Sequence, residues 1–427
     1  MKITSFLRYF YSAFFYLLTP WLILRLLWRS RRQVAYRQHI RERFGFGLPF
    51  LKKSIWLHAV SVGEALLAVA LVKKLRLRYP DLPFVVTTTT PTGAARIDAA
   101  LGDSVTHVYF PYDLPDVIKR FLDHLNPLIA IIIETELWPN LYAACVKRHI
   151  PIVIANARLS ERSALGYKRI SRLTQTMLSQ VNLIMAQSKQ DAARYIALGL
   201  QPSRAILTGN IKFDLEIPAD LISRKEVLRF DLGQERFIWI AASTHEGEEE
   251  IILKAHELIR KNLPQALLIL VPRHPERFTA VAELIKQAGF SMTRRSQGDQ
   301  CTPDTAVYLG DTMGEMFLFY AVADLAFVGG SLAPIGGHNL LEPAALAKPI
   351  LTGPQLFNFS EISQLLEKAG ALTKVTDASS LATALLALFS DPLLCKEIGK
   401  KGQEVVELNR GALAKHIDLI EKTISSQ

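Results

Sequence analysis

The sequence has few cysteines, and their positions exclude several classes of protein. The three cysteines, Cys145, Cys301 and Cys395, lie far apart, and no Cys-x-x-Cys pair occurs. This pattern indicates neither a disulfide framework nor a cysteine zinc site. A reducing compartment therefore fits the sequence best.

Common catalytic and nucleotide-binding motifs are also missing. There is no G-x-x-x-x-G-K-[ST] phosphate loop, and no G-x-G-x-x-G fingerprint follows the first expected strand. The G-x-S-x-G elbow and the H-E-x-x-H motif are absent as well. So is the D-x-D motif with which many enzymes that use nucleotide-diphosphate sugars hold a metal. We therefore expect a site without a metal ion or other cofactor.

Basic charge is concentrated at one end of the chain. The formal net charge is +10, yet residues 1–53 alone hold eleven Lys or Arg against one acid, Glu42, so residues 54–427 are neutral overall. A nucleic-acid enzyme usually spreads its basic residues over a binding face. Here the surplus flanks the most apolar stretch of the chain, which favours a membrane surface as partner and argues against nucleic acid.

The uncharged stretch at residues 9–24 reads YFYSAFFYLLTPWLIL. As a helix it would extend about 24 Å, less than the roughly 30 Å hydrocarbon core, and Pro20 would disturb it. A short tilted span and a helix in the membrane interface both remain open, as does a helix docked on the protein's own core. A cleaved signal peptide is disfavoured because no small-residue cleavage site follows. The positive-inside rule predicts that the rest of the chain lies on the cytoplasmic face of the inner membrane.

The rest of the chain alternates short apolar runs with longer amphipathic segments, which predicts parallel strands joined by helices. At 427 residues the chain is too long for one core. We predict an α/β fold with a membrane anchor at 1–35 and two doubly wound parallel-sheet domains, at 36–222 and at 223–427, the second including the terminal helices. The expected strands are 55–60, 84–88, 106–110, 128–133, 152–155, 183–186 and 205–208, then 237–241, 266–271, 306–309, 325–328, 349–351 and 372–375.

Glu64 is the first candidate for chemistry, because it follows the first expected strand in the segment HAVSVGE at 58–64. Ser61 and Glu64 have the spacing of a capping box, in which Glu64 only satisfies a backbone N–H. Alternatively, Glu64 faces the ligand-binding edge of the sheet as a general base for a sugar hydroxyl. A helix start normally gives a carboxylate a low pKa, which makes it a modest base. For Glu64 to be the general base, either its surroundings must raise its pKa or it must accept the proton late in the transition state.

Acids also follow the fourth expected strand, in the segment ETELWPN at 134–140. Glu134 and Glu136 either favour a helix dipole or, with the aromatic residue beside them, belong to a sugar site. Lys212 lies in GNIKFD at 209–214, near the end of the first domain. It is either solvated or faces the same site.

Strand ends in the second half carry residues suited to phosphate. Arg273, between two prolines in VPRHP at 271–275, offers a fork of donors to a phosphate or carboxylate. A polar turn occupies 310–316, and glycine-rich turns at 329–331 and 336–343 lead into a helix. Free N–H groups in such turns can cradle a phosphate, although many only permit tight turns. Three such strand ends in one domain indicate a nucleotide.

Together these segments resemble the 3-deoxy-D-manno-octulosonic acid (Kdo) transferases of lipopolysaccharide synthesis, whose GT-B glycosyltransferase fold has two Rossmann-like domains. The resemblance runs along most of the chain, and the combination of motifs in this order is highly specific. The N-terminal anchor matches too. The segments are WLHAVSVGE at 56–64, TTTTPTG at 87–93, YFPYD at 109–113, ETELWPN at 134–140, NARLSERS at 156–163, GNIKFD at 209–214, STHEGEE at 243–249, PRHPERF at 272–278, MGEM at 313–316 and GGSLAPIGGHNLLEPA at 329–344.

The resemblance implies an inverting glycosyltransferase that moves Kdo from CMP-Kdo to a lipid A precursor (lipid IVA). By motif, it implies that Glu64 is the general base and that Glu134 and Lys212 stabilise the transition state. The implied CMP contacts are Pro272, Arg273, Met313, Gly314, Glu315, Asn339, Leu340, Leu341 and Glu342.

Three other functions are compatible with part of this pattern. One is another GT-B glycosyltransferase that uses a UDP-sugar and a lipid-linked acceptor. A second is a sugar-nucleotide epimerase of the same architecture, which would be soluble, so the basic anchor argues against it. The third is a membrane-bound binding or scaffold protein without catalysis, against which the acid at Glu64 argues.

Overall fold

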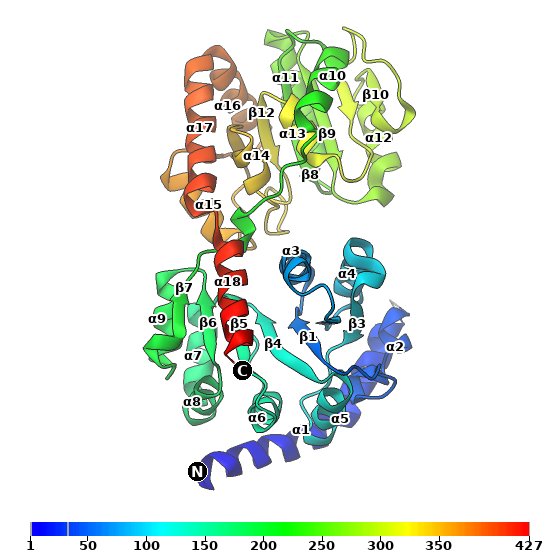
Figure 1. Ribbon diagram of the computed structural model, residues 1–427. Coiled ribbons are helices and arrows are strands. Elements are labelled where there is room, and N and C mark those ends of the chain that lie inside the picture. Colours follow the sequence, from blue (N-terminus) through cyan, green and yellow to red (C-terminus); the bar gives the residue numbers. More distant parts are fainter. Residues whose placement is uncertain (1, 32–33, 427) are drawn as a thin grey trace. The chain divides into compact units, whose positions relative to one another are not determined.

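The computed structural model describes residues 2–31 and 34–426 and divides the chain into two compact units (Figure 1). Unit 1 comprises Met1–Asp214 and Arg410–Gln427, and unit 2 comprises Leu215–Asn409. Arg32, one of the basic residues of the N-terminal flank, lies outside the described residues. The predicted α/β fold of two parallel-sheet domains is confirmed.

Unit 1 contains a parallel sheet in the order β3-β2-β1-β4-β5-β6-β7. Its central strands are buried along almost their whole length, as expected when helices cover both faces of a parallel sheet. The strand order reverses between β1 and β4. The strands are β1 (Ser54–His58), β2 (Phe84–Thr88), β3 (Thr106–Tyr109), β4 (Pro127–Ile133), β5 (Ile152–Ala157), β6 (Leu183–Ala186) and β7 (Ala205–Leu207).

The helices of unit 1 come from both ends of the chain. In order they are α1 (Lys2–Ser30), α2 (Ala35–Gln38), η1 (Glu42–Phe44), α3 (Val62–Arg78), α4 (Pro91–Leu101), η2 (Gly102–Ser104), α5 (Pro115–Leu125), α6 (Pro139–Lys147), α7 (Glu161–Arg169), α8 (Ser171–Ser179), α9 (Lys189–Ala197), η3 (Pro202–Arg204), η4 (Ile211–Phe213) and α18 (Ala412–Ser425).

Unit 2 contains a second parallel sheet, in the order β10-β11-β9-β8-β12-β13-β14, and here the order reverses between β8 and β12. Its strands are β8 (Ile238–Thr244), β9 (Leu267–Pro272), β10 (Met292–Arg294), β11 (Val307–Leu309), β12 (Leu325–Val328), β13 (Ile350–Thr352) and β14 (Leu372–Lys374). Its helices are α10 (Leu221–Leu232), α11 (Glu248–Asn262), η5 (Pro275–Arg277), α12 (Phe278–Gln287), η6 (Arg295–Gln297), α13 (Met316–Val322), α14 (Leu341–Ala345), α15 (Ser360–Lys368), α16 (Ala378–Ser390) and α17 (Pro392–Asn409).

The division between the units differs from the predicted boundary at 222/223. The break lies at 214/215, because Leu221 is buried in the core of unit 2 and begins its helix α10. The terminal helices, all predicted in the second domain, also divide between the units, because α17 ends unit 2 and α18 belongs to unit 1. Helix α18, red in Figure 1, joins unit 1 because Leu413, Ile417 and Ile420 pack into the core beneath α3.

Helix α1 runs through Pro20 without a break, so the disturbance expected there does not end the helix. Proline lacks the N–H of one backbone hydrogen bond, and the many other bonds of a helix this long maintain it. Among the described residues, α1 is the one unbroken helix that is long and apolar enough to cross a membrane.

Candidate active site

Glu64 adopts the capping arrangement that its spacing predicts. It lies in the first turn of α3, directly after β1. The Glu64 N–H donates to Ser61 Oγ at 3.3 Å, and Glu64 Oε2 accepts a 2.7 Å hydrogen bond from the Val60 N–H. Ser61 Oγ also donates to Glu64 Oε1 at 3.0 Å. Two hydrogen bonds therefore hold the carboxylate against the end of β1.

The surroundings of Glu64 nevertheless raise its pKa into the range of a general base that works near neutral pH. Burial raises the pKa of Glu64 to about 7, although the Val60 N–H lowers it and Glu134 adds a repulsive charge. Capping and a role as base are thus compatible, because the cap fixes the carboxylate while desolvation weakens it as an acid. The sequence left open either surroundings that raise the pKa of Glu64 or a base that acts late in the transition state. The structure has surroundings that raise the pKa.

Glu134 lies at the end of β4, the strand beside β1, with a φ of 61°. A positive φ is uncommon for a residue with a side chain and is found where surrounding contacts impose it. The Glu134 N–H donates to Ala155 O at 3.0 Å, which holds the strained residue to β5. Lys212 Nζ lies 3.5 Å from Glu134 Oε1, and both side chains are about one quarter exposed.

A network of amides positions the turn that carries Lys212. Asn210 Oδ1 accepts a hydrogen bond from the Lys212 N–H at 3.0 Å, and Asn156 Oδ1 accepts one from the Ile211 N–H at 2.9 Å. Gln187 Oε1 accepts from Asn210 Nδ2 at 3.0 Å. These buried side chains come from β5 and the loops after β6 and β7. They bring Lys212, distant in sequence, to the end of β4.

Glu136 is a further acid that the motif-based assignment leaves out. Burial, followed by the negative charge of Glu64, raises the pKa of Glu136 to about 7. The sequence offered a sugar site for Glu136 only as one of two alternatives, and the motif assigned it no role. Glu64, Glu134 and Glu136 thus gather at the β1/β4 edge, the point of strand reversal where doubly wound sheets bind ligands. Among the described residues, no group of three or more His, Cys, Asp or Glu has the arrangement of a metal site.

In unit 2, the predicted nucleotide-binding residues differ in their exposure and in whether their side chains already have partners. Pro272 ends β9, and the exposed Arg273 donates its N–H to Thr244 O at 3.0 Å. Met313 is 65% exposed. Glu315 is already paired with Arg295 at 2.8 and 3.0 Å, and the hydrogen bonds from Arg295 lower the pKa of Glu315 to about 2. Its carboxylate is therefore committed to arginines of unit 2.

In the segment 339–342, Asn339 and Glu342 are partly exposed. Leu340 and Leu341 are fully buried, so a ligand would meet the segment through Asn339 and Glu342. Asn339 Nδ2 donates to Glu342 Oε1 at 3.0 Å, and Asn339 Oδ1 accepts from the Leu341 N–H at 3.1 Å. Burial raises the pKa of Glu342.

The first glycine-rich turn, at 329–331, does not offer the free phosphate cradle expected of it. The carboxylate of the fully buried Glu248 already fills this turn. It accepts backbone hydrogen bonds of 2.7–3.4 Å from the N–H groups of His245, Gly330, Ser331, Leu332 and Ala333. An internal anion therefore occupies these donors and fixes the loop.

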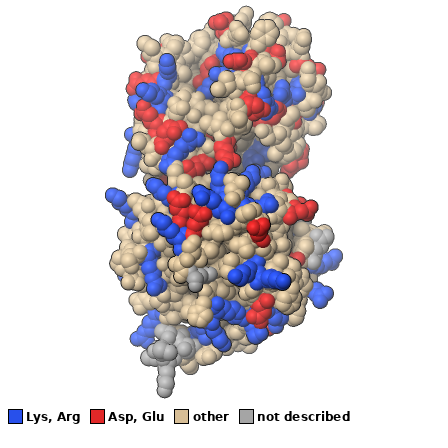
Figure 2. Space-filling view, in the orientation of Figure 1, with Lys and Arg blue, Asp and Glu red and all other residues tan. Residues whose placement is uncertain are grey.

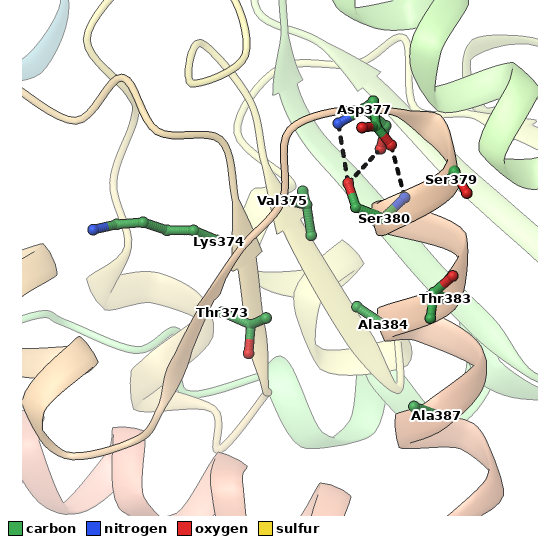
Figure 3. Close-up of a pocket in the computed structure, with 9 residues that line it drawn as sticks. All are labelled: Thr373, Lys374, Val375, Asp377, Ser379, Ser380, Thr383, Ala384 and Ala387. Atoms are coloured by element: carbon green, nitrogen blue, oxygen red, sulfur yellow. Dashed lines mark hydrogen bonds between the residues drawn. The ribbon is translucent and has the colours of Figure 1, made fainter.

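A pocket at the end of β14 contains none of the predicted residues (Figure 3). Its polar rim is the capping box of α16. Asp377 Oδ1 accepts from the Ser380 N–H at 2.8 Å, and Ser380 Oγ accepts from the Asp377 N–H at 3.1 Å. These groups satisfy each other, so the pocket has the features of a helix start and not of a catalytic site.

Comparison with known proteins identifies the family of the chain. Residues 38–215 match the family described as "3-Deoxy-D-manno-octulosonic-acid transferase (kdotransferase)". The chain is 45% identical to the 3-deoxy-D-manno-octulosonic acid transferase of Haemophilus influenzae over 97% of this chain and 98% of that one. It is 32% identical to the Bordetella pertussis enzyme of that name, over 92% and 94% of the two chains.

A solved structure with the same fold is UDP-GlcNAc 2-epimerase from Neisseria meningitidis, bound to UDP-GlcNAc. It is 13% identical, with a TM-score of 0.53, and the match covers 85% of this chain and 100% of that one. At this identity the likeness shows the fold alone. The two parallel-sheet domains and the full-length relatives define a GT-B glycosyltransferase. Within that class, the chain belongs to the Kdo transferases.

Proposed function

We propose that this enzyme transfers Kdo from CMP-Kdo to a lipid A precursor, lipid IVA, with inversion at the anomeric carbon. The observation that carries the proposal is the acid cluster at the β1/β4 edge, in which the pKa of Glu64 is raised to about 7. A carboxylate with this pKa can take a proton from a sugar hydroxyl at neutral pH. The motif resemblance supports CMP-Kdo as the donor, in place of a UDP-sugar.

In the proposed reaction, the acceptor hydroxyl oxygen attacks the anomeric carbon of Kdo and gives its proton to Glu64. The bond between that carbon and the phosphate oxygen breaks, and its electron pair leaves with CMP. Glu134 stabilises the positive charge that develops on the sugar, and Lys212 stabilises negative charge. Lys212 Nζ and Glu134 Oε1 lie 3.5 Å apart before substrate binds, so both charges are already in position to stabilise the transition state.

The CMP portion is proposed to bind unit 2 at Pro272 and Arg273, at the turn 313–315 and at 339–342. The Arg273 guanidinium suits the phosphate. Because Leu340 and Leu341 are fully buried, their proposed part is to hold Asn339 and Glu342 in place. Glu342 and Asn339 already form a hydrogen-bonded pair that can present an acceptor and a donor to the base or ribose.

We further propose that α1 attaches the enzyme to the cytoplasmic face of the inner membrane by lying in the interface. One side of α1 docks on unit 1, where Ser12 and Leu26 are buried and Ser12 Oγ donates to Asn140 Oδ1 at 3.1 Å. The opposite side carries an exposed stripe at helical spacing, formed by Phe6, Phe10, Phe14, Leu17, Trp21, Leu24 and Trp28.

The basic residues near α1 also support an interfacial position of this helix. Figure 2 shows Lys and Arg side chains, in blue, over the lower end of unit 1, where α1 lies. Arg25 Cζ lies 5.5 Å from the Trp21 ring centroid, so a cation accompanies the aromatic stripe. Basic residues beside an apolar stripe favour an anionic lipid surface.

The test of the reaction is a mass-spectrometric transfer assay with detergent-solubilised protein, CMP-Kdo and a tetra-acylated lipid A precursor. We expect product masses that increase by whole Kdo units. We expect Glu64→Gln to reduce transfer by roughly 10²–10⁴-fold, because the amide cannot accept the proton, while CMP affinity is nearly unchanged.

Glu226→Gln is the matched control, since Glu226 is exposed on α10 in unit 2, and it should transfer normally. Near wild-type turnover by Glu64→Gln would leave Glu64 only its capping role. Competition by UDP but not by CMP would refute the donor, and CMP binding without any product would refute the acceptor.

A further inference from the structure

Three histidines and an arginine meet at the carboxyl ends of neighbouring strands in unit 2. His245 follows β8, while Arg273 and His274 follow β9, and His338 lies in the long loop after β12. The Nε2 atoms of His245 and His338 are 2.7 Å apart. Their rings are stacked with centroids 5.0 Å apart, and His274 packs edge-on against His245 at 5.3 Å. The cluster lies at the β8/β12 reversal, where this type of sheet binds ligands.

The backbone is shaped to admit this pair of rings. Gly330 has a φ of 68°, and a Cβ at that position would lie 2.8 Å from His338 Cδ2 and Nε2. Four backbone hydrogen bonds to Glu248 fix the same loop, and a fifth, from the His245 N–H, ties the loop after β8 to the same carboxylate. On the other strand, Ser243 has a φ of 55° where the pairing of β8 with β9 shifts register, which turns the chain that carries His245. The pair is therefore built into the loop.

The charges around the pair favour an anion. Burial, then Arg273, His245 and His274, lowers the pKa of His338 to about 3. Burial also lowers the pKa of His245, which is faced by His274, Arg277 and Arg273 and by one acid, Glu248. Backbone donors already satisfy this acid, and Arg277 is paired with the buried Glu249 at 2.5 Å, so Arg273 is the guanidinium that can serve a bound anion. The free protein thus holds an uncharged histidine pair beside the Arg273 guanidinium, with one ring donating its Nε2–H and the other accepting.

We propose that Arg273, His274 and the His245–His338 pair form the subsite for the donor's phosphodiester, and that the pair takes up one proton when this anion binds. The proposal rests on the proposed CMP-Kdo site, which it extends by three histidines. One proton is the limit, because an imidazolium can donate across the 2.7 Å contact to a neutral ring, whereas two imidazolium rings would repel each other. The proton offsets the charge of the bound phosphodiester.

The test is calorimetric titration of the full-length protein with the methyl ester of CMP, a phosphodiester that does not titrate between pH 5 and 8. Measurement at pH 6 in two buffers with different ionisation enthalpies gives the protons exchanged. We expect uptake of about half a proton or more. Affinity should rise as pH falls from 8 to 6, by up to about tenfold per pH unit.

His338→Gln keeps hydrogen-bonding groups but cannot be protonated, so we expect it to bind the ester without proton uptake or pH dependence. His39→Gln, on the surface of unit 1, should behave as wild type. Tight binding by the wild-type protein without proton uptake would overturn the proposal and leave the CMP site intact. Because this measurement uses only the wild-type chain, it decides even if a variant fails to fold.

Two further ligands test the source of the anion. Cytidine lacks a phosphate, and the same proton uptake with cytidine would overturn the proposal. Dimethyl phosphate lacks the nucleoside, and affinity equal to that of the ester would show a general anion site instead of a nucleotide subsite. No binding of either CMP or its ester would instead refute the proposed donor function.

Discussion

At the scale of single residues, the main feature is a pair of acids whose environment places both pKa values near neutrality. Burial raises the pKa of Glu64 and of Glu136 to about 7, and the two carboxylates repel each other. Only the deprotonated form of Glu64 can accept a proton, so the proposed base is active above this pKa and inactive below it. The pH profile therefore reports directly on the acid cluster.

We predict that kcat/KM falls as pH decreases through about 7. Glu136→Gln removes one negative charge near Glu64, so it should move this acidic limb by roughly half a pH unit or more to lower pH. Transfer assays at pH 5.5 to 8.5 measure the limb, with Glu226→Gln as control. An unchanged limb in Glu136→Gln would show that another group controls the profile.

At the scale of elements, the contacts of α1 with the rest of unit 1 favour an interfacial helix over a membrane span. It is long enough to cross a membrane, but Ser12, in its first half, and Leu26, in its last turns, are buried against unit 1. A span would expose that side to lipid and leave Asn140 without Ser12. Leu17, at 81% exposure, shows how far the outward stripe remains uncovered.

We predict that the middle and the end of the stripe lie at one depth in anionic vesicles. Positions 17 and 28 are separated by about 17 Å along the helix axis, so a span would place position 17 near the bilayer centre and position 28 near a surface. Quenching by lipids brominated at defined acyl positions measures depth, using Trp28 in the Trp21→Phe variant and the introduced tryptophan of Leu17→Trp combined with Trp21→Phe and Trp28→Phe. Leu408→Trp, exposed in unit 2 and combined with the same two changes, is the unquenched control. Depths that differ strongly would favour a span.

At the scale of the whole molecule, the end of the chain completes the unit formed by its beginning. Asp214 accepts hydrogen bonds of 2.6 Å from the N–H groups of Gly411 and Leu413 at the start of α18. Further along α18, His416 Nε2 accepts from the Asn156 N–H at 2.9 Å. Burial lowers the pKa of His416 to about 4, so it stays neutral and accepts this bond at physiological pH. Asn156 in turn holds the Lys212 turn.

We predict that Asp214→Ala weakens the docking of α18 by about 1–2 kcal/mol, as loss of a helix cap does, and reduces transfer by misplacing Lys212. CMP binding in unit 2 should be retained. Asp377→Ala removes a cap of α16 within unit 2 and should leave transfer almost unchanged. Thermal unfolding, CMP titration and the transfer assay measure the three quantities. Wild-type transfer by Asp214→Ala would show that α18 does not position the site.

Local patterns in the chain were enough for much of the fold. All of the strands with continuous apolar runs were predicted, because buried parallel strands need such runs. Strand β10, with the sequence Met292-Thr293-Arg294, was missed because it is short and two of its three residues are polar. Glu64, Glu134 and Lys212 were assigned roles by motif, whereas Glu136 was named only as one of two acids that either favour a helix dipole or belong to a sugar site. The role of Glu248 as the anion inside the glycine-rich turn was equally invisible, because it depends on contacts across more than 80 residues.

The alternation of apolar and amphipathic segments, the basic N-terminal flank and the order of the motifs are properties of the chain itself, and they established the fold class and the family. The pKa of Glu64, the pairing of Lys212 with Glu134 and the histidine pair arise from burial and from residues far apart in sequence. The same holds for the return of α18 and for the docked side of α1. Desolvation and long-range contact exist only after the sheets are assembled, so these features belong to the tertiary structure.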